Sequence, residues 1–232
     1  MSRHALASAS RRPHRRGLSV CALAALWSIA SLAQAEDGCR VALGRGWPPA
    51  TENHGSAVEQ LLAAKAAPQL SLTYLPARGA ESGLLLIPGD GDWTLRHASA
   101  SERVAAWTSS RSGGALQLRV DQEVETEEAP IPAPLAQRLV ASWKRALAAM
   151  VPEDRGAEFT DKDQILFVVD GLRVSGLRPD CGPGETLMEQ AGLLTEASNE
   201  SASKRERRWR ELEESLDELD QRLSAAAAPS AD

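Results

Sequence analysis

The side chains in this sequence that could act as a base or a nucleophile match no catalytic motif in their spacing. Beyond residue 35 the chain holds two histidines, His54 and His97. A histidine can take a proton from a serine or cysteine, but only with a partner that this spacing does not identify. No G-x-S-x-G nucleophile elbow is present. We expect His54 in a Gly/Asn-containing loop and His97 on a sheet surface, and we assign no catalytic residue.

The sequence also lacks the motifs that hold metals or cofactors. There is no H-E-x-x-H and no C-x-x-C pair, so a zinc site is not predicted. Asp90-Gly91-Asp92 lacks the later ligands of a calcium loop and is interpreted as a turn. Neither a phosphate-binding loop nor a complete dinucleotide fingerprint occurs. We therefore expect no metal and no cofactor.

The first 35 residues have the order of a secretory signal peptide. Five arginines precede an apolar run, Leu18 to Leu32, which ends in Ala33-Gln34-Ala35. An uncleaved anchor is the alternative, but a run of about 15 residues is shorter than the roughly 20 that span a bilayer. We favour cleavage after Ala35, and hence a periplasmic or secreted bacterial protein with no stable membrane span.

Removal of residues 1–35 would leave an acidic chain with two cysteines. The leader holds five of the 26 Lys and Arg residues and none of the 32 Asp and Glu residues, so the remainder carries a net charge of −11. Phosphate backbones repel such a chain, which excludes a general nucleic-acid role. Cys39 and Cys181 are predicted to form a disulfide in an oxidising compartment. A reactive thiol is the alternative, without the C-x-x-C spacing of redox sites.

Alternating residues and turn residues predict an antiparallel sheet in residues 36–198. Runs at 84–87 and 93–97 flank a Gly/Asp turn, and runs at 165–169 and 172–174 flank Asp170-Gly171. Asp-Gly accepts the positive φ angles of a type I′ turn. Apolar residues at helical spacing predict helices that begin near Ser56, Pro134 and Leu187. The expected fold class is α+β, an antiparallel sheet with covering helices.

Three local expectations follow from composition. Residues 36–55 should be irregular, with a helix starting only at the Ser56 capping box. The acidic, proline-rich stretch 121–134 should be a solvated strand end and loop. Trp143, on an apolar helix face, should be buried, whereas Trp47 is the tryptophan to test for exposure.

The last segment, residues 199–232, is predicted to be one amphipathic helix. Its apolar residues are spaced 3, 4, 3, 4, which is a short heptad seam. The seam consists of Trp209, Leu212, Leu216, Leu219 and Leu223. Flanking charges would favour a parallel homodimer, since Arg208 would face Glu213 of the partner subunit. The alternative, which we rank ahead, is a helix docked on its own domain.

One stretch resembles a known group of proteins. The helical spacing of Trp143 and Leu147, the Asp170-Gly171 turn and Pro183-Gly184 before a leucine-bearing helix are similar to uncharacterised exported proteins of proteobacteria. The resemblance covers roughly residues 143–194. That group has no assigned activity, so the resemblance implies export and no catalytic residue.

These observations leave three hypotheses for function. The first is a non-enzymatic binding or interaction protein whose partner is an unknown protein or envelope component. The second is a cell-envelope hydrolase without a recognisable motif. The third is a structural accessory subunit that assembles through the C-terminal helix. A concave pocket that gathers His54, His97 or several acids would favour the hydrolase over the binding protein.

Overall fold

The computed structural model describes residues 39, 41–110 and 113–227. The predicted signal peptide, residues 1–35, lies outside this part of the chain. Within it, no helix combines the length and the apolar character that a membrane span requires.

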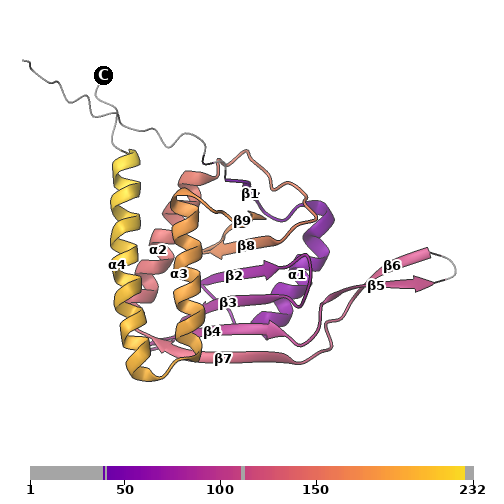
Figure 1. The fold of residues 1–232 in the computed structure, drawn as a ribbon, viewed down its shortest axis with the longest axis horizontal. Helices are drawn as coiled ribbons and strands as arrows, with labels where there is room; N and C mark the ends of the chain where they lie inside the picture. The colour runs from indigo at the N-terminus through magenta and orange to yellow at the C-terminus, as the bar shows by residue number, and fades with distance from the viewer. Residues whose placement is uncertain (1–38, 40, 111–112, 228–232) are drawn as a thin grey trace, which may run out of the picture. The chain divides into compact units, whose positions relative to one another are not determined.

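The body is built on an antiparallel sheet (Figure 1). Among the described residues it has seven strands in the order β1-β9-β8-β2-β3-β4-β7. The strands are β1 (Leu43–Arg45), β2 (Leu70–Leu75), β3 (Ser82–Ile87), β4 (Trp93–Ala100), β7 (Val124–Ile131), β8 (Gln164–Val169) and β9 (Leu172–Leu177). Each neighbouring pair is antiparallel, which confirms the predicted α+β class.

Helices cover both faces of the sheet. They are α1 (Pro49–Ala63), α2 (Ala133–Met150), α3 (Gly182–Asn199) and α4 (Ala202–Ala227). The first packs on one face, α2 and α3 pack on the other, and α4 lies against the outside of α2 and α3 (Figure 1). Because side chains of a strand alternate between faces, each face has its own apolar core.

The larger core lies between the sheet and the α2–α3 layer. Leu72, Leu84 and Phe167 from three neighbouring strands are buried in it. Trp143 of α2 is fully buried there, as predicted, with its ring edge-to-face against Phe167 at a centroid distance of 5.6 Å. The smaller core, under α1, includes Val58 and Leu62 of that helix.

The predicted hairpin turn at Asp170-Gly171 is confirmed. Asp170 has φ 46° and Gly171 has φ 82°, the two positive values that a type I′ turn needs. The turn joins β8 to β9, with Val169 opposite Leu172. The predicted pairing across the Gly/Asp turn is also found, since Leu86 of β3 lies opposite Leu95 of β4.

The expected start of the first helix was wrong. Helix α1 begins at Pro49, seven residues before Ser56, and therefore contains His54. A proline is favoured in the first turn of a helix because the missing N–H would have no partner there. Trp47, 9% exposed, packs against Gly55, where a Cβ would collide with the indole. Trp47 is thus a buried side chain that fixes the helix to the sheet.

The prediction of a solvated strand end and loop for the acidic stretch 121–134 was also wrong in part, because most of the stretch is a strand. Residues Val124–Ile131 form β7, which pairs with β4 along its whole length at the edge of the sheet. Backbone hydrogen bonds to β4 stabilise this strand. Its glutamates do not disrupt the strand, because the outer edge of the sheet faces solvent. An edge strand also tolerates Pro130.

Between β4 and β7 the chain forms a two-stranded hairpin, which we call the arm. It consists of β5 (Ala105–Ser110) and β6 (Gly113–Leu118), paired with each other. The arm projects away from the main sheet (Figure 1). Strand β5 was not predicted from the sequence.

Candidate functional site

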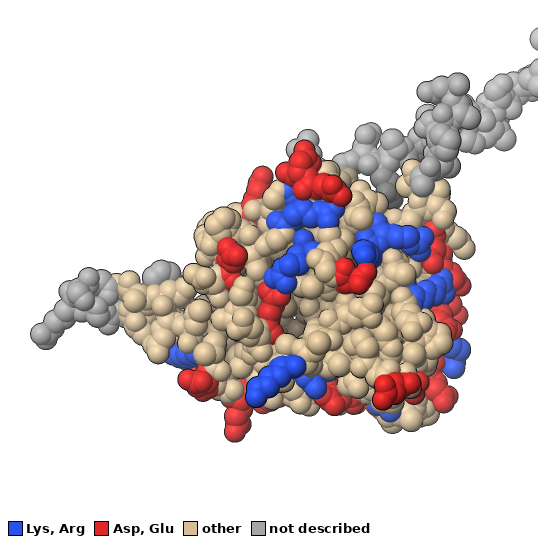
Figure 2. All heavy atoms as spheres, turned by 180° about the vertical axis from the view of Figure 1, so that it is seen from behind, with Lys and Arg blue, Asp and Glu red and all other residues tan. Residues whose placement is uncertain are grey.

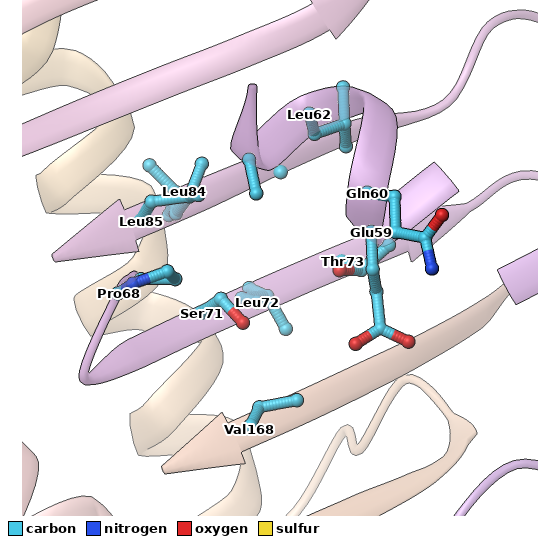
Figure 3. A pocket seen from close by; sticks show the side chains of 12 residues that line it. Glu59, Gln60, Leu62, Pro68, Ser71, Leu72, Thr73, Leu84, Leu85 and Val168 are labelled. Carbon is cyan, nitrogen blue, oxygen red and sulfur yellow. The ribbon is translucent and has the colours of Figure 1, made fainter. Parts of the chain in front are cut away.

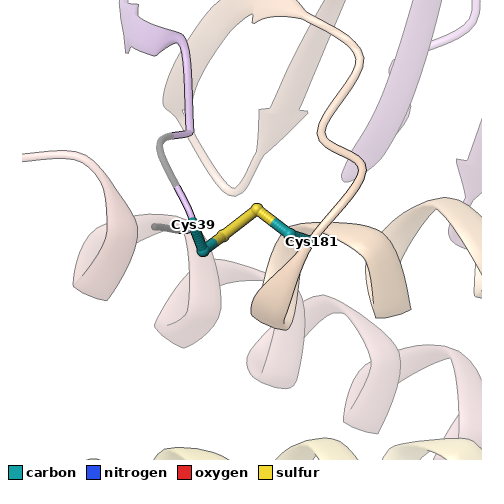
Figure 4. The surroundings of a disulfide bond; sticks show 2 residues. All are labelled: Cys39 and Cys181. Atoms are coloured by element: carbon teal, nitrogen blue, oxygen red, sulfur yellow. A yellow bond between two sulfur atoms is a disulfide. The ribbon is translucent and has the colours of Figure 1, made fainter. Parts of the chain in front are cut away.

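Cys39 and Cys181 are joined by a disulfide bond in the structure (Figure 4). Their sulfur atoms lie 2.08 Å apart, across a sequence separation of 142 residues. Cys181 directly precedes α3, so the bond ties the first described residue of the body to the start of that helix. The predicted pairing is therefore found, and the oxidising compartment remains a prediction.

His54 forms a buried pair on the α1 side of the sheet. Its Nε2 lies 2.8 Å from Oε1 of Glu81, whose side chain is fully buried. The other carboxylate oxygen accepts the N–H of Val104 at 2.7 Å. Burial raises the pKa of Glu81, but the hydrogen bonds from His54 and Val104 outweigh it and hold the pKa below its usual value. Both oxygens are thus used in joining α1 to the base of the arm.

A cavity of about 290 Å³ lies beside the C-terminal half of α1 (Figure 3). Glu59 and Leu62 of the helix face side chains from β2, β3 and β8 across it. The Glu59 carboxylate is already bound, because it accepts the Trp47 indole N–H at 2.7 Å and a two-pronged contact from Arg173 at 2.7 and 3.0 Å. The Glu59 carboxylate therefore serves the fold, and no other charged side chain among the described residues lines this cavity.

A second hollow, also of about 290 Å³, lies on the opposite face of the sheet under α3. We call it the α3 cleft. It is lined by Leu72, Tyr74, Ser82, Gly83, Leu84, His97, Ile165, Arg178, Met188, Ala191, Gly192 and Thr195. Leu72, Leu84 and Ile165 form an aliphatic floor from β2, β3 and β8, and polar side chains are also present in the lining. Gly192 leaves the α3 side open, because a Cβ there would meet no atom within 4 Å.

Strand register sets the neighbours of the polar side chains on this face of the sheet. Tyr74 of β2 lies opposite Ser82 of β3, and His97 of β4 lies opposite Glu127 of β7. The latter two are only loosely paired, with His97 Nδ1 3.8 Å from the Glu127 carboxylate. All four residues come from the side of the strands that faces α3. His97 also lies opposite Leu84 of β3, so this histidine borders the aliphatic floor.

Tyr74 and Arg178 have different availability for a ligand. The Tyr74 hydroxyl donates to Asp163 at 2.5 Å, and burial, followed by this hydrogen bond, raises the pKa of Tyr74. Its proton is therefore committed to Asp163. Arg178 forms no ion pair with any residue that the structure describes, although its side chain lines the cleft. It is the cleft's fixed positive charge.

The structure separates the two histidines that sequence analysis singled out. His54 is in α1 and binds Glu81 under that helix, whereas His97 lines the α3 cleft on the other face. Sequence reasoning missed Tyr74, Ser82 and Arg178 as cleft residues. Alternation along a strand indicates which of its side chains share a face, but nothing local indicates which strands lie next to it.

The seam of the C-terminal helix is used within the chain. Leu212, Leu216 and Leu219 are fully buried in the larger core, and Trp209 and Leu223 are partly buried beside it. The docked alternative is therefore the arrangement found. A parallel homodimer through the same residues would require α4 to leave α2 and α3, and it remains an untested prediction.

Polar contacts hold α4 in this position. Asp220 accepts hydrogen bonds from Ser142 at 2.9 Å, from Arg138 at 3.1 Å and from Arg145 at 2.6 Å. Burial raises the pKa of Asp220, but these α2 side chains more than offset it, so the pKa lies below its usual value. The negative charge of Asp220 on α4 is therefore paired with the two arginines of α2.

Within the described ranges, no cluster of three His, Cys, Asp or Glu side chains could hold a metal ion. Comparisons with protein-family models, with curated proteins and with solved structures found no match. The resemblance to exported proteobacterial proteins therefore remains a prediction, and the geometry of the α3 cleft carries the functional argument.

Proposed function

We propose that this chain is an exported binding protein, and that the α3 cleft takes a small molecule with an apolar body and one anionic group. The supporting observation is Arg178, a guanidinium at a mainly aliphatic cleft with no ion pair among the described residues. Binding sites for small molecules combine an apolar lining with a few polar groups that fix orientation. An arginine is well suited to a carboxylate because it can donate two parallel hydrogen bonds.

The size of the α3 cleft restricts the ligand. Its volume of about 290 Å³ is at the lower end of the ~300–1,000 Å³ typical of small-molecule sites. The aliphatic floor from Leu72, Leu84 and Ile165 suits an alkyl chain rather than a sugar, which needs more hydrogen-bonding partners. A medium-chain carboxylic acid such as decanoate fits both requirements.

Binding of decanoate, measured by titration calorimetry, tests this proposal. Arg178→Gln should weaken binding about tenfold or more by removing the charge-assisted hydrogen bonds. Gly192→Phe should abolish binding by filling the cleft. Arg119→Gln is the matched control, because this exposed arginine pairs with Glu102 near the arm instead. Failure of decanoate to bind the wild-type protein, or equal binding by all three variants, would reject the proposed site.

Export is part of the proposal and has its own test. It rests on the order of charges and apolar residues in residues 1–35. We expect protein recovered from the periplasm or medium of its natural host to have an intact mass that lacks these residues. A mass that retains them would contradict cleavage, whatever the outcome of the binding experiment.

One observation favours a hydrolase as the alternative. Ser82, His97 and Glu127 lie on adjacent strands and on one face, the order in which a nucleophile, a base and an orienting carboxylate are used. Ser82 lies opposite Ser99, which places it diagonally from His97. No hydrogen bond joins Ser82 to His97 in the described structure, and such bonds can be loose without substrate. Hydrolysis of p-nitrophenyl butyrate that is lost in Ser82→Ala would support this function, and activity that Ser82→Ala retains would reject it.

A further inference from the structure

The arm is the part of the described structure with the least support from the rest of the chain. Its strands pair with each other, and no other described strand pairs with either of them. Leu118 contacts the smaller core at the base of the arm, whereas Leu116 is 44% exposed. A two-stranded hairpin is at best marginally stable in water without a third strand or a packed face. Both outer edges of the arm are therefore open to another strand.

The edges of the main sheet differ in composition from the edges of the arm. The main sheet ends in β1, which has three residues, and in β7, which carries Glu125, Glu127, Glu128 and Pro130. Short, charged or proline-bearing edges prevent strands of other molecules from adding to a sheet. Neither β5 nor β6 contains a charged residue or a proline. In Figure 2 the described part of the arm is accordingly largely uncharged, while both signs of charge are spread over the body.

We infer that the arm pairs edge to edge with the arm of a second copy of this chain. Residues 36–232 carry a net charge of −11, so two copies repel each other over most of their surface. An uncharged contact is what two identical acidic chains need. A basic partner would instead gain from acidic side chains at its contact, and the arm offers none. The uncharged strands of the arm therefore favour a second copy over a basic protein.

The geometry suits a closed pair. Two copies of one edge strand, placed antiparallel about a two-fold axis, would extend two hairpins into a four-stranded sheet. Because the arm projects from the body, the two bodies need not touch. A contact between two six-residue strands is smaller than the ~1,200–2,000 Å² of stable interfaces, so the dimer should dissociate on dilution.

Sedimentation equilibrium of the purified protein over a range of concentrations tests the inference. We expect the wild-type molar mass to rise from one chain toward two with concentration. Leu116→Lys should weaken this dimer about tenfold or more, because a lysine in the pairing segment is a typical edge protector. Val120→Lys is the matched control, since Val120 is equally exposed, at 45%, but lies two residues beyond β6.

Each outcome decides the inference. Dimerisation of the wild type and of Val120→Lys, together with loss in Leu116→Lys, would support it. A wild type that stays monomeric at its highest soluble concentration would overturn the inference. This result would count against a second copy even if the arm pairs with a strand of another protein. Equal dimerisation by both lysine variants would place the contact elsewhere. Because both residues are exposed and neither belongs to a core, both variants should keep the circular dichroism spectrum of the wild type, which serves as the test of folding.

Discussion

The imidazole Nε2 of His54 lies 2.8 Å from Oε1 of Glu81, a carboxylate with no exposed surface. An ionised carboxylate can only accept hydrogen bonds, so His54 is the donor. The same glutamate accepts the Val104 N–H with its second oxygen, and its backbone carbonyl accepts the Ala100 N–H at 2.9 Å. One buried residue thereby joins α1, the end of β4 and the base of the arm.

Glu81→Gln should lower the free energy of unfolding by about 1–3 kcal/mol at pH 7. The amide keeps the size of the side chain but loses the charge that strengthens both hydrogen bonds. Urea unfolding followed by circular dichroism would measure the change. Glu127→Gln, at an exposed glutamate of β7, is the control and should change stability by less than about 0.5 kcal/mol.

The contribution of Glu81 should also depend on pH in a defined direction. Its pKa in the folded protein lies below the ordinary 4.5, so the unfolded chain takes up a proton first as the pH falls. The stabilisation is therefore complete above pH 4.5 and is lost as the pH falls through the folded value. The difference between wild type and Glu81→Gln should shrink over that acidic window. A difference that grows on acidification would contradict the assignment.

Two glycines of α3 should respond in opposite directions to the same substitution. Gly192→Ala should raise the free energy of unfolding by about 0.5–1 kcal/mol, because alanine is the better helix former and its Cβ has open space. Gly184→Ala should lower it by about 1–3 kcal/mol, since its Cβ would lie 2.6 Å from that of Pro179. Urea unfolding of both variants measures this, and a change of the same sign in both would show that α3 is placed wrongly.

Removal of the disulfide should be the most destabilising covalent change. The bond closes a loop with a separation of 142 residues, for which the chain-entropy relation gives up to about 5 kcal/mol. The double variant Cys39→Ser/Cys181→Ser should unfold at a correspondingly lower urea concentration. Either single variant, and the reduced wild type, should match it, because each lacks the same bond. Additive effects of the two single changes would indicate separate roles.

Local signals were sufficient to predict much of the fold. The Asp170-Gly171 turn, the paired runs on either side of 88–92 and the burial of Trp143 all depend on residues close together in sequence. A signal for the true start of α1 was also present, because Pro48-Pro49 is typical of a first helical turn. The Ser56 capping box was a competing signal, and the packing of Trp47 on Gly55 decided between them.

The α3 cleft could not be predicted in this way. Its lining depends on the register that sets Tyr74 opposite Ser82 and on the pairing of β2 with β8, which joins segments some 90 residues apart. Strand order is a long-range property that one sequence does not reveal. The first strand of the arm was missed for a different reason, since alanine and serine have little preference for strands.

The heptad spacing of the C-terminal helix left a docked helix and a parallel homodimer open, and the buried seam allows a test between them. Leu216→Ala should lower the free energy of unfolding by about 2–5 kcal/mol, because it opens a cavity where the side chain is fully buried. Glu218→Ala, at an exposed position two residues further on, is the control and should have little effect. If the seam is used only within the chain, Leu216→Ala should leave the molar mass at each protein concentration unchanged from that of the wild type. A mass that falls in this variant while its helix content is retained would instead mean that α4 leaves its own domain to pair with a second copy.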